Sequence, residues 1–379
     1  MNWFKEANNY DNYLAGIMTD DNYYAYIINT GTYLDQYNLV RGSDSIDLHK
    51  FIIKNHYSDT SLMRMLASNN TISEEIQSII LDLTISNSDK YPLKSFLATN
   101  PSTTHKIQMR LFKKISHDGI DRQLEELLVR NINLSPKIQL AFTNDIYNKR
   151  IFLLCELAKN PSVIPEAQKY LVNYKNAEGN KKYEEMVLEN LATNTKLIAD
   201  IQLLIAKRYY ENNYDNIDII NELSKNISTT EEVQIYLINR CIEGGVVPSS
   251  LDDTISLICK NKGIKDQAQM IVIEAAINKI IPPVYLEILS KNTSISHKAQ
   301  RAMINIDYSK IEEVRPSHMR WVSYKDNVLS NILENDNISL EALRLISRNN
   351  KTNKIKVYSK RLKKIRADGT TPFSVHRNF

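Results

Sequence analysis

Residues 97–108 read LATNPSTTHKIQ, and the same order of residue types recurs nine times along the chain. Each copy has an apolar residue, two spacers, Asn and a short polar stretch, and eight copies then carry Gln. The Asn residues are Asn69, Asn100, Asn131, Asn160, Asn194, Asn226, Asn261, Asn292 and Asn335. The Gln residues are Gln77, Gln108, Gln139, Gln168, Gln202, Gln234, Gln269 and Gln300, and Leu343 takes this place in a degenerate ninth copy. Consecutive Asn residues are 31, 31, 29, 34, 32, 35, 31 and 43 positions apart.

A period of about 32 residues is typical of two-helix repeats. In eight copies an apolar residue stands four positions before the motif's own apolar residue, as Leu93 does before Leu97. Such an i, i+4 pair marks one face of an amphipathic helix. Asn tolerates the left-handed backbone conformation that often closes a helix, so we expect the motif Asn to end the first helix in that conformation.

The second helix of each copy also has a recognisable start. Six copies carry Ser or Thr four residues after the Asn, where a hydroxyl can cap the helix, and Pro136 and Pro165 suit its first position. Three residues after the Gln position, eight copies have an apolar residue that should face the core: Ile80, Leu111, Phe142, Leu171, Ile205, Leu237, Val272 and Met303. The predicted fold is therefore all-α, an α-solenoid of about nine helix-turn-helix repeats.

The repeated Gln has two interpretations. In the structural one, its amide bonds to the turn of the adjacent repeat and forms a ladder with the Asn side chains, which satisfies buried backbone groups. In the functional one, the amides line a groove and bind a repetitive ligand.

Where the sequence departs from this pattern, we predict segment boundaries, and these divide the chain into three segments. Residues 1–57 hold seven Tyr by position 37 and form either an N-terminal cap or a Tyr-rich partner surface. Residues 58–350 form the repeat array, with an insertion at 307–326, and residues 351–379 form a basic C-terminal segment.

The insertion and the basic segment hold the candidate binding residues. Basic and aromatic side chains alternate in the insertion, where they can stack bases and bind phosphates or form a longer helix with Trp321 in the core: Arg315, Arg320, Trp321, Tyr324 and Lys325. The basic segment is either a solvated helix or a contact with nucleic acid or an acidic protein surface, through Lys360, Arg361, Lys363, Lys364 and Arg366.

Charge is distributed unevenly along the chain. Residues 351–379 contain nine Lys and Arg and one Asp, a net charge of +8. Residues 1–350 contain 39 Lys and Arg and 43 Asp and Glu, a net charge of −4. A solenoid that wraps duplex nucleic acid should carry basic charge on its repeats, so the acidic body disfavours that function.

No recognisable motif predicts an enzyme. The sequence has no phosphate-binding Gly loop, GxSxG or HExxH, and its three Cys have no spacing typical of zinc or a disulfide framework. We therefore expect no catalytic residues, cofactor or metal. The start lacks a secretory signal and no apolar run is long enough for a membrane span. This predicts a cytoplasmic protein without membrane contact; the bias toward Asn, Ile, Lys and Tyr suggests a phage or bacterial origin, with the host cytoplasm as the location if phage-encoded.

The segments LATNP (97–101) and LAKNP (157–161) resemble the core motif of leucine-rich repeat variant proteins, and the longer period is similar to that of HEAT-type helix pairs. The resemblance covers roughly residues 58–350. It implies a right-handed stack of helix pairs with a concave binding face, and most members of such families are binding scaffolds. One HEAT-like branch consists of DNA glycosylases with basic concave surfaces, aromatics and a catalytic acid, which the acidic body and the two Trp disfavour. PUF-type RNA readers are also helical repeats, but their base-reading pattern is not apparent.

These observations favour a non-enzymatic scaffold that binds a protein partner along one face of the solenoid. The alternative is nucleic-acid binding through residues 351–366 and 315–325, and a HEAT-like DNA repair enzyme is the weakest of the three hypotheses. The oligomeric state stays open.

Overall fold

A computed structural model of the chain describes residues 20–86, 92–117, 122–144, 150–176, 178–244, 254–311, 324–349 and 360. Every regular element in these ranges is a helix, which confirms the predicted all-α class. The chain divides into two compact units, residues 1–171 and 172–379. None of the helices in the described ranges combines the length and apolar character needed to cross a bilayer.

Nine helix pairs carry the nine motif copies, as predicted. The first helices of the pairs are α5 (Thr60–Ala67), α7 (Pro92–Thr99), α9 (Arg122–Val129), α11 (Ile151–Lys159), α13 (Lys181–Ala192), α15 (Asp218–Lys225), α17 (Thr254–Lys260), α19 (Val284–Ser290) and α21 (Tyr324–Glu334). The second helices are α6 (Glu74–Ser86), α8 (His105–His117), α10 (Pro136–Phe142), α12 (Pro165–Val172), α14 (Ala199–Glu211), α16 (Glu231–Glu243), α18 (Asp266–Ile277), α20 (His297–Ile304) and α22 (Leu340–Asn349).

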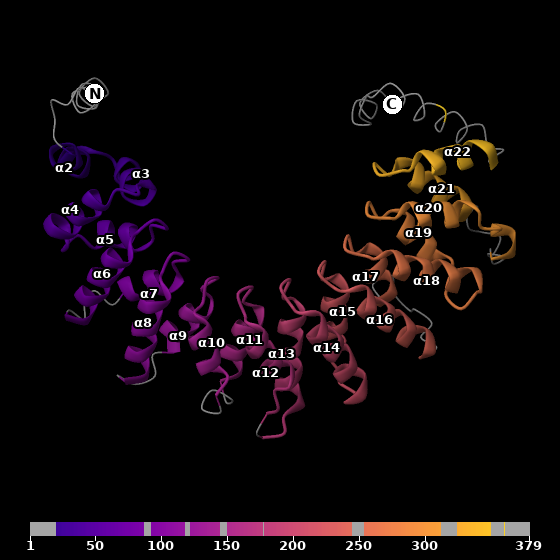
Figure 1. Cartoon of the computed structure of the whole chain (residues 1–379), viewed down its shortest axis with the longest axis horizontal. Helices are drawn as coiled ribbons and strands as arrows, with labels where there is room; N and C mark the ends of the chain where they lie inside the picture. Colours follow the sequence, from indigo (N-terminus) through magenta and orange to yellow (C-terminus); the bar gives the residue numbers. More distant parts are fainter. Residues whose placement is uncertain are drawn as a thin grey trace, which may run out of the picture. The chain divides into compact units, whose positions relative to one another are not determined.

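Within each unit the pairs stack in chain order (Figure 1). First helices pack against first helices, as α5, α7 and α9 do in unit 1 and α13, α15 and α17 do in unit 2. Second helices likewise pack against second helices, for example α14 against α16 and α16 against α18. Each pair therefore buries its apolar face against its neighbours, which is how a solenoid builds a continuous core.

The apolar positions predicted from the repeat form that core. The eight residues three positions after the Gln are all fully buried, including Phe142 and Met303 at 0% exposure. The residues four positions before the motif's apolar residue are also buried; for example, Leu62 is 1% exposed and Val328 is 0% exposed. Both helix faces were therefore predicted correctly from their spacing.

Within the described residues, three further helices precede the repeats, namely α2 (Asp20–Thr30), α3 (Tyr33–Gly42) and α4 (Ile46–His56). They pack on the first pair through contacts of α3 with α5 and of α4 with α6. Tyr24 is buried between them, whereas Tyr33 is 67% exposed. In the segment before the last pair, a short 3-10 helix η3 (Tyr308–Lys310) is described, and residues 312–323 of the insertion lie outside the described ranges.

The predicted conformation of the motif Asn is wrong. Asn160 has φ −65° and ψ 123°, and Asn226 has φ −66° and ψ 118°, so both are extended. Among the described residues other than Gly, positive φ occurs at Asn213 and Lys279. The side chain of the motif Asn instead donates to carbonyls at the end of the first helix of the preceding repeat, as Asn100 does to Ala67 and Asn69.

The predicted hydroxyl caps are confirmed in four of six copies. The hydroxyls of Ser73, Thr104, Ser296 and Ser339 accept the backbone N–H three residues later, at 3.0–3.4 Å. Ser135 and Thr230 precede their helices without such a bond. Pro136 and Pro165 are the first residues of α10 and α12, as expected.

Candidate functional site

The motif Asn side chains bond each helix pair to the pair before it. Asn261 donates both Nδ2 hydrogens, to the carbonyls of Ser224 (2.7 Å) and Asn226 (3.0 Å). Its Oδ1 accepts the N–H of Gly263 at 2.7 Å. The same two backward bonds are made by Asn100, Asn131, Asn160, Asn226 and Asn292. Because one of the two backward bonds of each Asn ends on the carbonyl of the preceding motif Asn, these bonds form a ladder within each unit.

The motif Gln side chains reach in the opposite direction. Gln234 donates to Thr229 in its own repeat and to Gly263 in the next, each at 3.1 Å, while its Oε1 accepts the N–H of Lys265 at 2.9 Å. The equivalent forward bonds are made by Gln77, Gln108, Gln139, Gln202, Gln269 and Gln300.

These amides are therefore part of the fold. The eight Gln side chains are at most 1% exposed, and the two N–H groups of each amide described above already have acceptors. The structural interpretation of the Gln is confirmed. The functional interpretation, in which the amides line a groove and bind a ligand, is wrong, because these amides are buried and their N–H groups already have acceptors. Any binding site has to use other residues.

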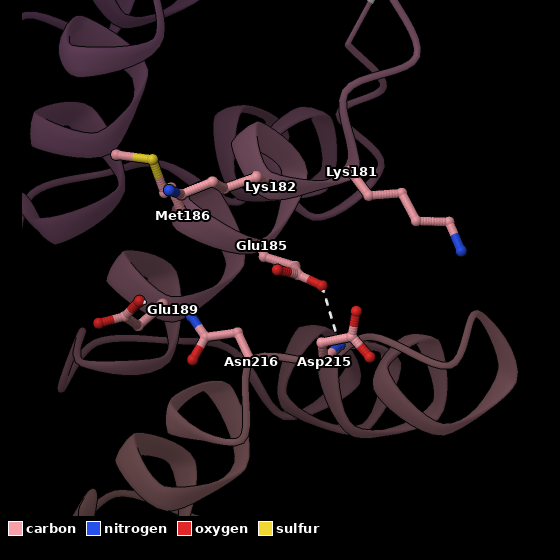
Figure 2. Close-up of a pocket in the computed structure, with 7 residues that line it drawn as sticks. All are labelled: Lys181, Lys182, Glu185, Met186, Glu189, Asp215 and Asn216. Atoms are coloured by element: carbon pink, nitrogen blue, oxygen red, sulfur yellow. Dashed lines mark hydrogen bonds between the residues drawn. The ribbon is translucent and has the colours of Figure 1, made fainter.

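A pocket of about 640 Å³ lies in unit 2 (Figure 2). It is formed by residues 181–189 of α13 and by the connection between α14 and α15. Its lining residues are Lys181, Lys182, Glu185, Met186, Glu189, Asp215 and Asn216. The pocket thus combines three carboxylates, two ammonium groups and one thioether.

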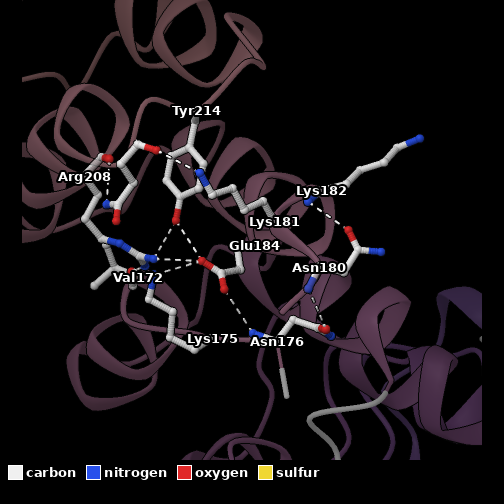
Figure 3. Close-up of polar contacts among 10 residues, drawn as sticks. Val172, Lys175, Asn176, Asn180, Lys181, Lys182, Glu184, Arg208 and Tyr214 are labelled. Carbon is white, nitrogen blue, oxygen red and sulfur yellow. Dashed lines mark hydrogen bonds and ion pairs between the residues drawn. The ribbon is translucent and has the colours of Figure 1, made fainter. Parts of the chain in front are cut away.

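Next to the pocket, a buried network holds the connections together (Figure 3). Glu184 is 6% exposed and its Oε2 accepts from Lys175 (3.0 Å), Arg208 (3.3 Å) and the Tyr214 hydroxyl (2.8 Å). Its Oε1 accepts the N–H of Asn176 at 3.2 Å. Arg208, itself 6% exposed, also donates to the Tyr214 hydroxyl at 2.7 Å and to the carbonyl of Val172.

The electrostatics of this network follow from these bonds. Burial opposes ionisation of Glu184, but the hydrogen bonds from Lys175, Tyr214 and Asn176 outweigh it, so the pKa of this carboxyl is lowered. Burial and the bond to Glu184 raise the pKa of Tyr214 to about 12, so its phenol stays protonated and donates. The network is a satisfied ion-pair cluster that fixes the entry to α13.

Glu185, the next residue, has a different environment. It is 9% exposed, and its Oε1 accepts the backbone N–H of Asp215 at 3.0 Å. Among the described residues, no Lys or Arg nitrogen lies within 4.0 Å of its carboxylate, although Lys181 and Lys182 line the same pocket. Lys181 instead donates to the carbonyl of Asn212 at 3.3 Å, and its side chain extends away from Glu185 in Figure 2.

The other two carboxylates of the pocket keep acceptor capacity. Glu189 accepts one bond, from the Asn216 amide at 2.8 Å. Asp215 is exposed and contributes its backbone N–H to Glu185. The pocket therefore presents carboxylate oxygens that could accept further hydrogen bonds from a cationic group.

The acidity of the repeat body is concentrated in this region. Residues 178–244 hold 12 Asp and Glu and seven Lys and Arg, a net charge of −5. The rest of residues 1–350 holds 31 acidic and 32 basic residues. This local excess is visible in the sequence, but the sequence alone does not place these carboxylates in one pocket.

The residues predicted from the sequence to bind a partner are mostly not described. Arg315, Arg320, Trp321, Arg361, Lys363, Lys364 and Arg366 lie outside the described residues. Tyr324 and Lys325 are the first two residues of α21, and Lys360 is exposed. The structure thus places Tyr324 and Lys325 on one helix turn and leaves the remainder of the hypothesis as a prediction.

Within the described ranges, no group of three or more His, Cys, Asp or Glu side chains is placed to hold a metal ion. In comparisons with known proteins, no family model, curated protein or solved structure matches this chain significantly.

Proposed function

We propose that this chain is a non-enzymatic scaffold that binds a protein partner along the α13–α16 region of unit 2, and that the partner contributes a basic segment. The observation that carries this proposal is the net charge of −5 over residues 178–244, next to a nearly neutral remainder of the repeat body. Complementary charge steers association and selects partners. The phage-like or bacterial origin, the cytoplasmic location and the kinship with HEAT-like or leucine-rich repeat variant families remain hypotheses.

Two features of the surface support a partner here. The motif Asn and Gln amides form hydrogen bonds within the fold. The residues that distinguish this region from the other repeats are therefore the non-repeated ones around α13. The pocket also places Met186 among its charged residues, and the flexible thioether of Met adapts to varied side chains. A polar rim with a soft apolar element is typical of protein-binding surfaces.

The test is capture from an extract of the source organism with two baits of equal charge change. One bait carries Glu189→Lys, Asp215→Lys and Asp218→Lys. The control bait carries the same change at exposed acids outside the α13–α16 region, namely Asp266, Glu274 and Glu341. We expect the wild-type and control baits to retain the same partner and the pocket bait to lose it. Equal retention by all three baits, or no specific partner for the wild type, would contradict the proposal.

Nucleic-acid binding is the second candidate, favoured by the net charge of +8 in residues 351–379. Phosphate contacts by this segment would make binding strongly salt-dependent. A gel shift with single- and double-stranded DNA and RNA should then show binding by the full chain that disappears in a truncation ending at Asn350. Salt-independent binding, or binding that survives the truncation, would exclude the segment as the site.

A further inference from the structure

Adjacent carboxylates on α13 differ in a way that points to a ligand. Glu184 has two cationic partners and a phenol donor within hydrogen-bond distance. Glu185 is about as buried, yet it has one backbone N–H and no cation among the described residues. Buried charges in folded proteins are normally paired or neutralised. Glu185 departs from this rule, because it lacks the cation that Glu184 has.

The surroundings of Glu185 define what that cation should be. Glu185, Glu189 and Asp215 together leave several carboxylate lone pairs without donors. A guanidinium has five N–H donors in a planar fork and pairs with carboxylates in a bidentate way, which an ammonium cannot do. Met186 offers an apolar surface for the methylene stem of such a side chain.

We infer that this pocket is the anchor for one arginine side chain of the protein partner, with Glu185 as its principal carboxylate. The inference rests on the proposed function and names the chemistry recognised at its site. Lys182 lines the same pocket without an ion pair among the described residues, so its ammonium competes with the incoming arginine. Removing that ammonium should therefore strengthen binding.

The full chain labelled with ¹³C at its methionine methyl groups provides a direct readout, because Met186 lines the pocket. The Met186 resonance is assigned from its disappearance in Met186→Leu. The probe is acetyl-Gly-Arg-Gly-amide, and its neutral isostere with citrulline in place of arginine is the control. We expect a saturable shift of the Met186 signal with the arginine peptide and none with the citrulline peptide.

Two variants test the roles of the charged groups. Glu185→Gln should weaken binding of the arginine peptide about ten-fold, because the variant loses the charge-assisted hydrogen bonds of the carboxylate. Lys182→Met should strengthen it. Equal shifts with both peptides, no shift of Met186, or an unchanged affinity in Glu185→Gln would overturn the inference.

These outcomes are separable from those of the capture experiment. If the charge-reversed bait loses its partner but the arginine peptide does not bind, the scaffold function holds and the arginine anchor is wrong. If the peptide binds at Met186 but no partner is captured, the anchor holds and the proposed function is wrong.

Discussion

The turns inside the helix pairs and the connections between pairs are built in opposite ways. Inside a pair, the turn is fixed by an Asn and a Gln whose amides bond to neighbouring turns, as Asn261 and Gln234 do around Gly263. Between pairs, the connections at α13 and α15 are fixed by charged side chains, with Glu184 at the centre. The motif amides described above already have acceptors, whereas the irregular connections leave carboxylates in a pocket. In this chain, repetition serves the fold and departure from it provides the candidate site.

The largest effect is expected at a middle rung of the ladder. Asn261→Ala removes two donors and one acceptor, so the carbonyl of Ser224 and the part-buried N–H of Gly263 lose their partners, while the carbonyl of Asn226 keeps the N–H of Thr229. Each unsatisfied buried group costs about 1–3 kcal/mol, so we expect a loss of about 4 kcal/mol in the free energy of unfolding. Urea denaturation measures it. Asn239→Ala, at an exposed position of α16, is the control and should change stability by less than about 0.5 kcal/mol.

Glu184 should come next, with a dependence on pH. Glu184→Gln leaves Arg208 buried without its counter-charge, and breaking a buried ion pair costs about 3 kcal/mol at pH 7. Because the pKa of Glu184 is lowered in the folded state, its contribution is complete at neutral pH and is lost as pH falls through that pKa.

Thermal denaturation of the wild type and Glu184→Gln across this pH range provides the check. The stability difference should be constant near neutral pH and should shrink below about pH 4. A difference that does not change with pH would mean that the charge of Glu184 is not what stabilises the connection.

At Gly263 the repeat pattern and the local geometry predict different effects of a substitution. Four described repeats carry Ser two positions after the Asn, namely Ser102, Ser162, Ser228 and Ser294, so the sequence pattern alone predicts that Gly263→Ser is harmless. A Cβ at Gly263 would lie 2.2 Å from the carbonyl oxygen of Ile227. We therefore expect a loss of about 2 kcal/mol from overpacking against backbone, measured by urea denaturation. The reverse change, Ser294→Gly, should cost less, about 0.5–1 kcal/mol.

The smallest effect on stability is expected at Glu185. Its carboxylate has no cationic partner in the described chain, so Glu185→Gln should change the free energy of unfolding by less than about 0.5 kcal/mol. The same denaturation series that includes Glu184→Gln measures it. A loss comparable to that of Glu184→Gln would show that Glu185 is structural and would remove the reason for assigning it a ligand.

The repeat was sufficient to predict the all-α class, the nine helix pairs and both buried faces, because spacing fixes which side chains share a helix face. It was not sufficient for the motif Asn, whose role depends on a carbonyl about 31 residues away, as in the bond from Asn100 to Asn69. The pocket was out of reach for the same reason, since Glu185 and Asp215 meet only when successive pairs stack. The sequence likewise did not predict the need for Gly at position 263, because that need depends on the close approach of the Ile227 backbone.

Cross-linking of the captured complex with an amine-reactive reagent, followed by mass spectrometry of the linked lysines, tests most directly whether α13 anchors the partner. Lys181 and Lys182 line the pocket, whereas Lys356, Lys360 and Lys364 belong to the basic C-terminal segment. If α13 anchors the partner, the links to the partner should concentrate at Lys181 and Lys182. Links confined to the C-terminal lysines, with none at Lys181 or Lys182, would contradict it.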